Sequence, residues 1–317
     1  MTIGIAAYGP RAGLGVFCAL EAVEKVATGS IGGYATFATL DSQGRLYRAE
    51  TQRGGTTTLF VDGETTGVRP PDEIAQATMA GVMSSGPDRP TPLAQYLPVE
   101  PGAGLVTGHR LPNAHGVNDR AVNLQVLDLL RQGFNARVAV NKVFDAEPDV
   151  DAGIIAVDVS GGVFSRNSDR VLQRPDLGHA RLHDSSTGAV IEILHNAISP
   201  IGSIAALAAE IGMAAMLEVE EVDGEITVME NVPVVAGTMN RVLIDDKGVA
   251  LQIETTDSRI LTGRHNCAAI YLRSLVVHND SILGETVFEP NVVVDGGRIV
   301  TLNNQKQMRI GYRKSDR

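Results

Sequence analysis

The sequence contains no tryptophan, and aromatic residues make up only 4% of it. Proteins that stack bases or sugars on flat side chains need such residues, so this class of protein is not expected. No apolar run reaches the roughly eighteen residues that a membrane-spanning helix needs. The first residues also lack a basic segment followed by an apolar stretch, so we expect no secretion signal.

Cysteine and positive charge are scarce as well. The two cysteines, Cys18 and Cys267, lie far apart and match no metal-binding spacing, so no metal is expected. Their scarcity suits a reduced, cytoplasmic protein. The formal net charge of −10, without a basic stripe, argues against nucleic acid and anionic membranes as partners. No motif requires a cofactor, so the expected partners are a small-molecule substrate and further copies of the chain in a homo-oligomer.

Two stretches of the chain repeat one pattern. Residues 32–51 and 151–168 each run from glycine through an apolar segment to Asp-x-x-Gly and then into a second apolar segment. Asp begins such a turn by bonding its own backbone, and Gly supplies the positive φ that closes it. Each stretch is therefore predicted to be an antiparallel hairpin that follows a helix. A shorter copy at residues 243–251 shows that such hairpins also occur as ordinary parts of a β-rich chain.

The remaining patterns predict an alternation of helices and antiparallel strands. Apolar spacing and capping residues predict helices over 16–27, 72–82, 118–131, 136–144 and 199–216. Short apolar runs predict strands at 2–8, 104–108 and 190–194, with further hairpins at 218–229 and 292–300. We therefore predict an α+β fold in which stacked antiparallel sheets lie between helix layers (αββα) in residues 1–216. Residues 217–317 are predicted to form a β-rich C-terminal extension.

Three short motifs carry a resemblance to a known superfamily. Gly29-Ser30-Ile31-Gly32-Gly33, the Asp41–Gly44 turn and Thr51-Gln52-Arg53-Gly54-Gly55 together resemble the N-terminal-nucleophile (Ntn) hydrolases, most of all their isoaspartyl-peptidase and asparaginase branch. The stretch 104–109, with the helix and hairpin that follow it, resembles an uncharacterised bacterial Ntn-like family. The resemblance covers roughly residues 1–170 and implies hydrolysis of an amide bond by a hydroxyl nucleophile.

An Ntn mechanism implies a Thr, Ser or Cys whose own α-amine acts as the base. Removal of Met1 would expose Thr2, and self-cleavage after Gly29 would expose Ser30, which stands where the family pattern has Thr. Thr56 is a weaker third candidate. Each has an ordinary structural alternative: a second residue in a strand, a helix-to-strand turn, and a threonine-rich run.

Five further residues are candidates for holding the substrate or the oxyanion. Arg53 offers a two-pronged cation, and Gly54 and Gly55 let backbone N–H groups approach a ligand. His109 and Asn196 each follow a predicted buried strand, a usual position for site residues. The leading hypothesis is a hydrolase that cleaves an amide, a cyclic amide or an imide in a small polar compound. The alternative is a non-catalytic protein that binds a small ligand or forms an oligomer on the same scaffold.

Overall fold

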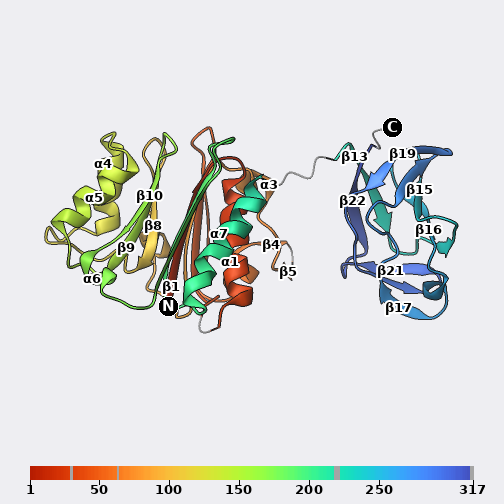
Figure 1. Ribbon diagram of the computed structural model, residues 1–317, viewed down its shortest axis with the longest axis horizontal. Coiled ribbons are helices and arrows are strands. Elements are labelled where there is room, and N and C mark those ends of the chain that lie inside the picture. Colours follow the sequence, from red (N-terminus) through yellow and green to blue (C-terminus); the bar gives the residue numbers. More distant parts are fainter. Residues whose placement is uncertain (29–30, 63, 218–221, 315–317) are drawn as a thin grey trace. The chain divides into compact units, whose positions relative to one another are not determined.

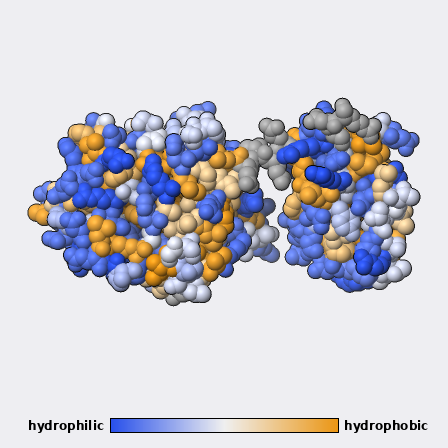
Figure 2. Space-filling model, in the orientation of Figure 1, coloured by the Kyte–Doolittle hydropathy of each residue, from blue (hydrophilic) through white to orange (hydrophobic). Residues whose placement is uncertain are grey.

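The computed structural model describes residues 1–28, 31–62, 64–217 and 222–314, and the chain forms two compact units, Met1–Val219 and Glu220–Arg317. Figure 1 shows helices and strands in the first unit and strands in the second. In the face shown in Figure 2, hydrophilic and hydrophobic residues are mixed over the surface of both units. No helix of the described residues is long and apolar enough to cross a membrane.

The first unit contains a six-stranded antiparallel sheet in the order β11-β12-β1-β6-β2-β3. Its central strands are buried along almost their whole length, because both faces of the sheet are covered. The strands are β1 (Thr2–Tyr8), β2 (Ala35–Leu40), β3 (Leu46–Thr51), β6 (Met79–Ser85), β11 (Leu177–His183) and β12 (Val190–Asn196).

A second antiparallel sheet packs on the first and has the order β10-β9-β8-β7. Helices cover the two outer faces, so that the unit has four layers: helices, sheet, sheet, helices (Figure 1). The strands are β7 (Val99–Glu100), β8 (Gly104–Arg110), β9 (Ala152–Asp158) and β10 (Val163–Asn167). The covering helices are α1 (Ala12–Val26) and α7 (Ile201–Leu217) on the larger sheet, and α4 (Val122–Arg131) and α5 (Ala136–Ala146) on the smaller.

Short elements connect these layers. They are α2 (Thr56–Leu59), β4 (Val61–Asp62), β5 (Thr65–Thr66), α3 (Asp72–Ala75), the 3-10 helix η1 (Leu93–Tyr96) and α6 (Asp169–Leu172). Apolar side chains alternate along the central strands, so one set packs on α1 and α7 while the other lies between the sheets. Ile3 and Ile5 of β1 belong to the first set, which turns Thr2 and Gly4 toward the second sheet.

The two sheets approach closely at Gly4 of β1 and Gly108 of β8. A Cβ added at Gly4 would lie 2.4 Å from the Gly108 carbonyl oxygen, a distance that real carbon atoms do not adopt. Nearby, the Thr107 hydroxyl of β8 donates to the Val82 carbonyl of β6 at 2.9 Å, which joins the sheets by a hydrogen bond. Sheets with side chains between them pack about 10 Å apart, so these glycines bring the backbones unusually near.

The second unit has its own apolar core between a seven-stranded sheet and a three-stranded sheet. The larger sheet has the order β13-β22-β19-β18-β15-β16-β14, and the smaller has the order β17-β20-β21. The elements are β13 (Gly224–Met229), β14 (Val234–Ala236), β15 (Arg241–Ile244), β16 (Ala250–Thr255), η2 (Ser258–Leu261), β17 (Arg264–Cys267), β18 (Leu275–His278), β19 (Ser281–Thr286), β20 (Val292–Asp295), β21 (Arg298–Leu302) and β22 (Gln307–Arg313).

The predicted α+β fold with stacked sheets between helix layers and a β-rich C-terminal part is confirmed. The hairpins predicted at 32–51 and 151–168 are β2–β3 and β9–β10, and they lie in the two different sheets of one unit. The hairpins predicted at 243–251 and 292–300 are β15–β16 and β20–β21.

Two predicted elements are wrong. The helix predicted over 72–82 ends after one turn at Ala75, and residues 79–85 form β6, next to β1 in the sheet. The hairpin predicted at 218–229 is absent from the residues that the structure describes there, because β13 pairs with the distant strand β22. Residues 218–221 of that prediction lie outside the described residues.

We predict that Gly4→Ala destabilises the protein, because the added methyl group must push the sheets apart at Gly108. Overpacking of this kind costs about 1–3 kcal/mol or more in free energy of unfolding. Gly202→Ala is the matched control, since nothing lies within 4 Å of its added Cβ at the start of α7. Urea unfolding should show no loss of unfolding free energy for Gly202→Ala. Equal unfolding free energies of the two variants would contradict the close approach of the sheets.

Candidate active site

Thr2 begins β1 and lies opposite Asn196 of β12 on one side and Ser85 of β6 on the other. Its side chain is only 2% exposed. A threonine at the end of a buried central strand suits β structure, since its branched Cβ fits the pleat, but its hydroxyl needs a partner when buried. The partners come from both sheets.

The Thr2 hydroxyl donates to Asn196 Oδ1 at 2.6 Å, and the backbone N–H of Arg110 in β8 donates to Thr2 Oγ1 at 2.6 Å. His109, the residue before Arg110, places Nδ1 at 3.3 Å from Asn196 Oδ1 and Nε2 at 2.6 Å from Asn167 Oδ1 of β10. We call Thr2, His109, Asn167 and Asn196 the Thr2 site. It joins four strands of the two sheets by side-chain hydrogen bonds.

His109 is completely buried, and this burial lowers its pKa to about 4 against the opposing hydrogen bonds from Asn167 and Asn196. The ring is therefore neutral near pH 7. A neutral imidazole has one donor and one acceptor nitrogen. Because Asn196 Oδ1 also accepts the Thr2 hydroxyl, Asn196 presents its oxygen to the ring, and Asn167 is the residue that presents its NH₂ group.

Two buried groups at the end of β12 have no hydrogen-bond partner within the described residues. They are Asn196 Nδ2, on a residue that is 1% exposed, and both ring nitrogens of His195. Burial and the neighbouring His109 lower the pKa of His195 to about 4. Its ring lies against Gly178 of β11, where an added Cβ would lie 1.9 Å from Nε2. A buried donor without an acceptor costs folding free energy, and a ligand that accepts from it removes this cost. Asn196 Nδ2 is such a donor, next to the Thr2 hydroxyl.

The backbone adopts a positive φ at the last residue of β8 and at the residue that follows β12. Arg110 follows His109 with φ of 63°, and Ala197 follows Asn196 with φ of 55°. Residues with a side chain adopt this left-handed region rarely, and such residues are frequent at functional sites. At Arg110, this conformation accompanies the N–H bond to Thr2 Oγ1.

The charges of three arginines act on the amine of Met1, which precedes the site. Burial lowers the pKa of this amine, and the charges of Arg110, Arg89 and Arg174 lower it further. Arg110 forms a two-pronged ion pair with Asp151, at 2.9 and 2.5 Å. Asp151 also lines a surface cavity of about 580 Å³.

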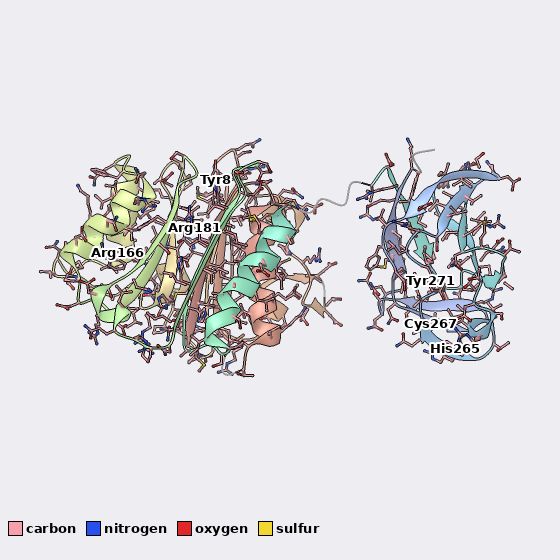
Figure 3. All side chains as sticks on the ribbon, in the orientation of Figure 1. Tyr8, Arg166, Arg181, His265, Cys267 and Tyr271 are labelled. Atoms are coloured by element: carbon pink, nitrogen blue, oxygen red, sulfur yellow. The ribbon has the colours of Figure 1, made fainter. Side chains whose placement is uncertain are left out.

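A second polar group lies between the sheets farther along β12. The buried carboxylate of Glu192 accepts hydrogen bonds from the Ser165 hydroxyl at 2.6 Å, from His179 at 3.2 Å and from Arg181, which is labelled in Figure 3. Burial raises the pKa of Glu192, but these bonds and the Arg181 charge outweigh burial and hold the pKa below its usual value. The carboxylate is thus engaged with two side chains of the neighbouring strand β11 and, through Ser165, with the second sheet.

The other predicted site residues lie elsewhere. The Arg53 side chain is 83% exposed and pairs with Asp88 at 3.0 Å, beyond edge strand β3, so no contact joins it to His109 or Asn196. Gly54 and Gly55 precede α2 with φ of 93° and 50°. Thr56 is buried, and its N–H donates to Glu24 at 2.9 Å. Ser30 lies outside the described residues.

Sequence reasoning missed Asn167 and Arg110. Both could have been suspected, because Asn167 ends the hairpin predicted at 151–168 and Arg110 follows His109 directly. Two histidines of the C-terminal unit, His265 and His278, are each followed by asparagine in the sequence and make simple local contacts. His265, labelled in Figure 3, donates from Nε2 to the Thr262 carbonyl at 2.7 Å, and His278 contacts Asp246 at 2.8 Å.

Comparison with protein families gives two matches. A family described as "Domain of unknown function (DUF6963)" matches residues 2–225, which include the whole Thr2 site and more than half of the chain. A family described as "Domain of unknown function (DUF7259)" matches residues 231–307, within the second unit. No curated protein matches the chain.

We predict that acid destabilises the protein as pH falls from about 6.5 to about 4. In that range the histidines of the unfolded chain bind a proton, whereas folded His109 and His195 do not. Their contribution to the free energy of unfolding is therefore full above about pH 6.5 and is lost as the pH falls toward 4. Each histidine contributes up to roughly 3 kcal/mol, since one pKa unit is about 1.4 kcal/mol. Thermal unfolding across this range measures the effect.

The variant His195→Leu should unfold at a higher temperature than the unmodified protein at pH 5 and should show a weaker pH dependence. It removes a ring with two unpartnered nitrogens and keeps a similar volume. His183→Gln, at an exposed position on β11, is the control and should leave the pH dependence unchanged. An unaltered profile in His195→Leu would show that His195 does not resist protonation.

Proposed function

The chain belongs to the DUF6963 family, and we propose that its N-terminal unit is an Ntn-type amidohydrolase with Thr2 as the nucleophile. One observation supports this most. The Thr2 hydroxyl, at the start of a central strand, is held from both sheets by Asn196 Oδ1 and the Arg110 N–H, beside a neutral histidine. This is the arrangement of a positioned hydroxyl in an αββα unit with resemblance to the Ntn hydrolases.

The base in this proposal is the α-amine of Thr2 after removal of Met1. An amine is a base only when it is unprotonated, so its pKa has to lie near the working pH. The Met1 amine already has a lowered pKa because of burial and the charge of Arg110. The Thr2 amine would lie one residue deeper among the same charges, and we infer that its pKa is lowered as well.

The proposed reaction has two steps. The Thr2 amine takes the hydroxyl proton, Oγ1 attacks the amide carbon, and the C–N bond breaks as the leaving nitrogen receives that proton. Water then attacks the resulting ester, which releases the carboxylic acid and restores the hydroxyl. Asn196 Nδ2 is free to donate to the oxyanion of each tetrahedral intermediate, an interaction typically worth about 3–4 kcal/mol in the barrier.

The other residues of the site position these groups. His109 and Asn167 fix the Asn196 amide, while the Arg110 N–H fixes Thr2 Oγ1. The substrate class is an amide, a cyclic amide or an imide of a small polar compound. Arg53, Gly54 and Gly55 have no part in this proposal, because Arg53 is engaged with Asp88 beyond the edge strand.

We predict that Thr2→Ala abolishes amide hydrolysis while Thr2→Ser retains part of it. Loss of a nucleophile lowers kcat by about a thousandfold or more. Alanine, serine and threonine are all small, so Met1 should be removed from each protein, and intact-mass spectrometry checks this. Activity is screened on small amides and cyclic imides by ammonia release or ring opening.

Folding is the control for Thr2→Ala. Losing the two hydrogen bonds of the hydroxyl should cost about 1–3 kcal/mol of unfolding free energy, too little to unfold the unit. Ser30→Ala tests the second sequence candidate and should keep full turnover. Retention of Met1 on an uncut chain, with full turnover in both variants, would exclude an Ntn mechanism. A well-folded protein that binds small amides without any turnover would favour the non-catalytic alternative.

A further inference from the structure

An arginine accompanies each neighbour of Thr2. Arg110 supplies the N–H that bonds Thr2 Oγ1. Arg89 Nε lies 3.4 Å from the hydroxyl of Ser85, which is opposite Thr2 on β6. Arg174 pairs with Asp176, whose carbonyl accepts the N–H of the residue that follows Asn196. All three arginines are partly buried.

Two of these arginines are neutralised by carboxylates and the third is not. Arg110 pairs with Asp151, and Arg174 pairs with Asp176 at 2.9 and 2.6 Å. Arg89 has no carboxylate partner within the described parts of the chain. Its guanidinium contacts the Ser85 hydroxyl and lies 5.8 Å from the centre of the Tyr96 ring. A half-buried guanidinium without an acid is suited to bind an external anion.

Arg89 is also held in place. The Gln52 side chain bonds its backbone twice, donating from Nε2 to the Arg89 carbonyl at 2.6 Å and accepting the Arg89 N–H at 3.0 Å. Tyr96, beneath the guanidinium, packs edge-on against buried Tyr34 at 5.5 Å. Gln52 belongs to the Thr51–Gly55 motif, so this motif contributes to the site through Gln52, although Arg53 points elsewhere.

We propose that the Arg89 guanidinium binds a carboxylate of the substrate, so that the substrate is a small amide that carries a carboxylate. The proposal rests on the proposed function for the identity of the reacting group. Side chains opposite each other on adjacent strands are about 5 Å apart, which places the guanidinium within roughly 10 Å of Thr2 Oγ1. A chain of two or three carbons between carboxylate and amide spans this distance.

The selectivity follows from charge and geometry. Arg89 would neutralise the carboxylate and orient the molecule, with its amide carbon toward Thr2 and its carbonyl oxygen toward Asn196 Nδ2. Replacing the carboxylate by a second carboxamide removes the charge but keeps the shape. The matched probes are therefore succinamate and glutaramate, which carry one carboxylate, against the neutral diamides succinamide and glutaramide.

The experiment uses the full chain with Thr2 as its first residue, produced from a fusion whose cleavage leaves Thr2 exposed. Arg89→Gln should raise KM for the monoamides at least tenfold, with little change in kcat, and should not change KM for the diamides. Arg89→Lys keeps the positive charge but lacks the two-pronged guanidinium, so its KM for the monoamides should lie between those of the unmodified protein and Arg89→Gln. Gln52→Ala should raise KM for the monoamides a few-fold and leave the diamides unaffected, as expected of a positioning residue. Arg45→Gln, at an exposed ion pair in a turn, is the control and should behave as the unmodified protein.

Calorimetric binding of glutarate separates this proposal from the hydrolase proposal, because it needs no turnover. Glutarate binding that is lost in Arg89→Gln, without hydrolysis of any probe, supports the anion site and overturns the proposed hydrolase. Hydrolysis of diamides and monoamides with equal kcat/KM supports the hydrolase and overturns the role of Arg89. The role of Arg89 is also overturned if glutarate does not bind and the monoamides are not preferred over the diamides.

Discussion

The close approach of the two sheets at Gly4 and Gly108 is the constraint on which the candidate site depends. Without a Cβ at Gly4, the backbone of β8 comes near enough to β1 for the Arg110 N–H to reach Thr2 Oγ1 at 2.6 Å. With side chains between them the sheets would stand farther apart, and Thr2 and His109 would belong to separate surfaces. The contact of two glycines therefore lets residues of both sheets form one site.

Burial is what makes this site chemically distinct. Four polar side chains meet in a largely apolar interior, and most of their hydrogen-bonding atoms have a partner, either in the same sheet or, between His109 and Asn196, in the opposite sheet. In such surroundings, unpaired donors are costly and histidine stays neutral. The exception, Asn196 Nδ2, is thus a group whose cost is offset only when something binds to it.

The sequence predicted the layers better than the site. Asp-x-x-Gly turns revealed the hairpins of both sheets, because such turns depend on local backbone chemistry. The strand β6 was mistaken for a helix, since a fully buried strand such as Met79–Ser85 is an unbroken apolar run without alternation. The pairing of β13 with β22 could not be predicted, because it joins segments more than eighty residues apart at Arg309 and Glu225. Of the candidates, Thr2, His109 and Asn196 meet, whereas Arg53 lies three strands away beyond the edge.

The sequence by itself determined the α+β class, the two hairpins and the choice of residue types that follow apolar strands, because turns and strand ends depend on neighbours along the chain. Only the tertiary structure decided which strand ends share a site. Strand order separates Arg53 from Thr2, although both lie near strand ends of one sheet. Sheet packing brings Thr2 to His109 and Arg110, and the Thr2–Arg110 hydrogen bond joins residues 108 apart in the sequence. Such distances depend on how the sheets pack, which no local pattern encodes.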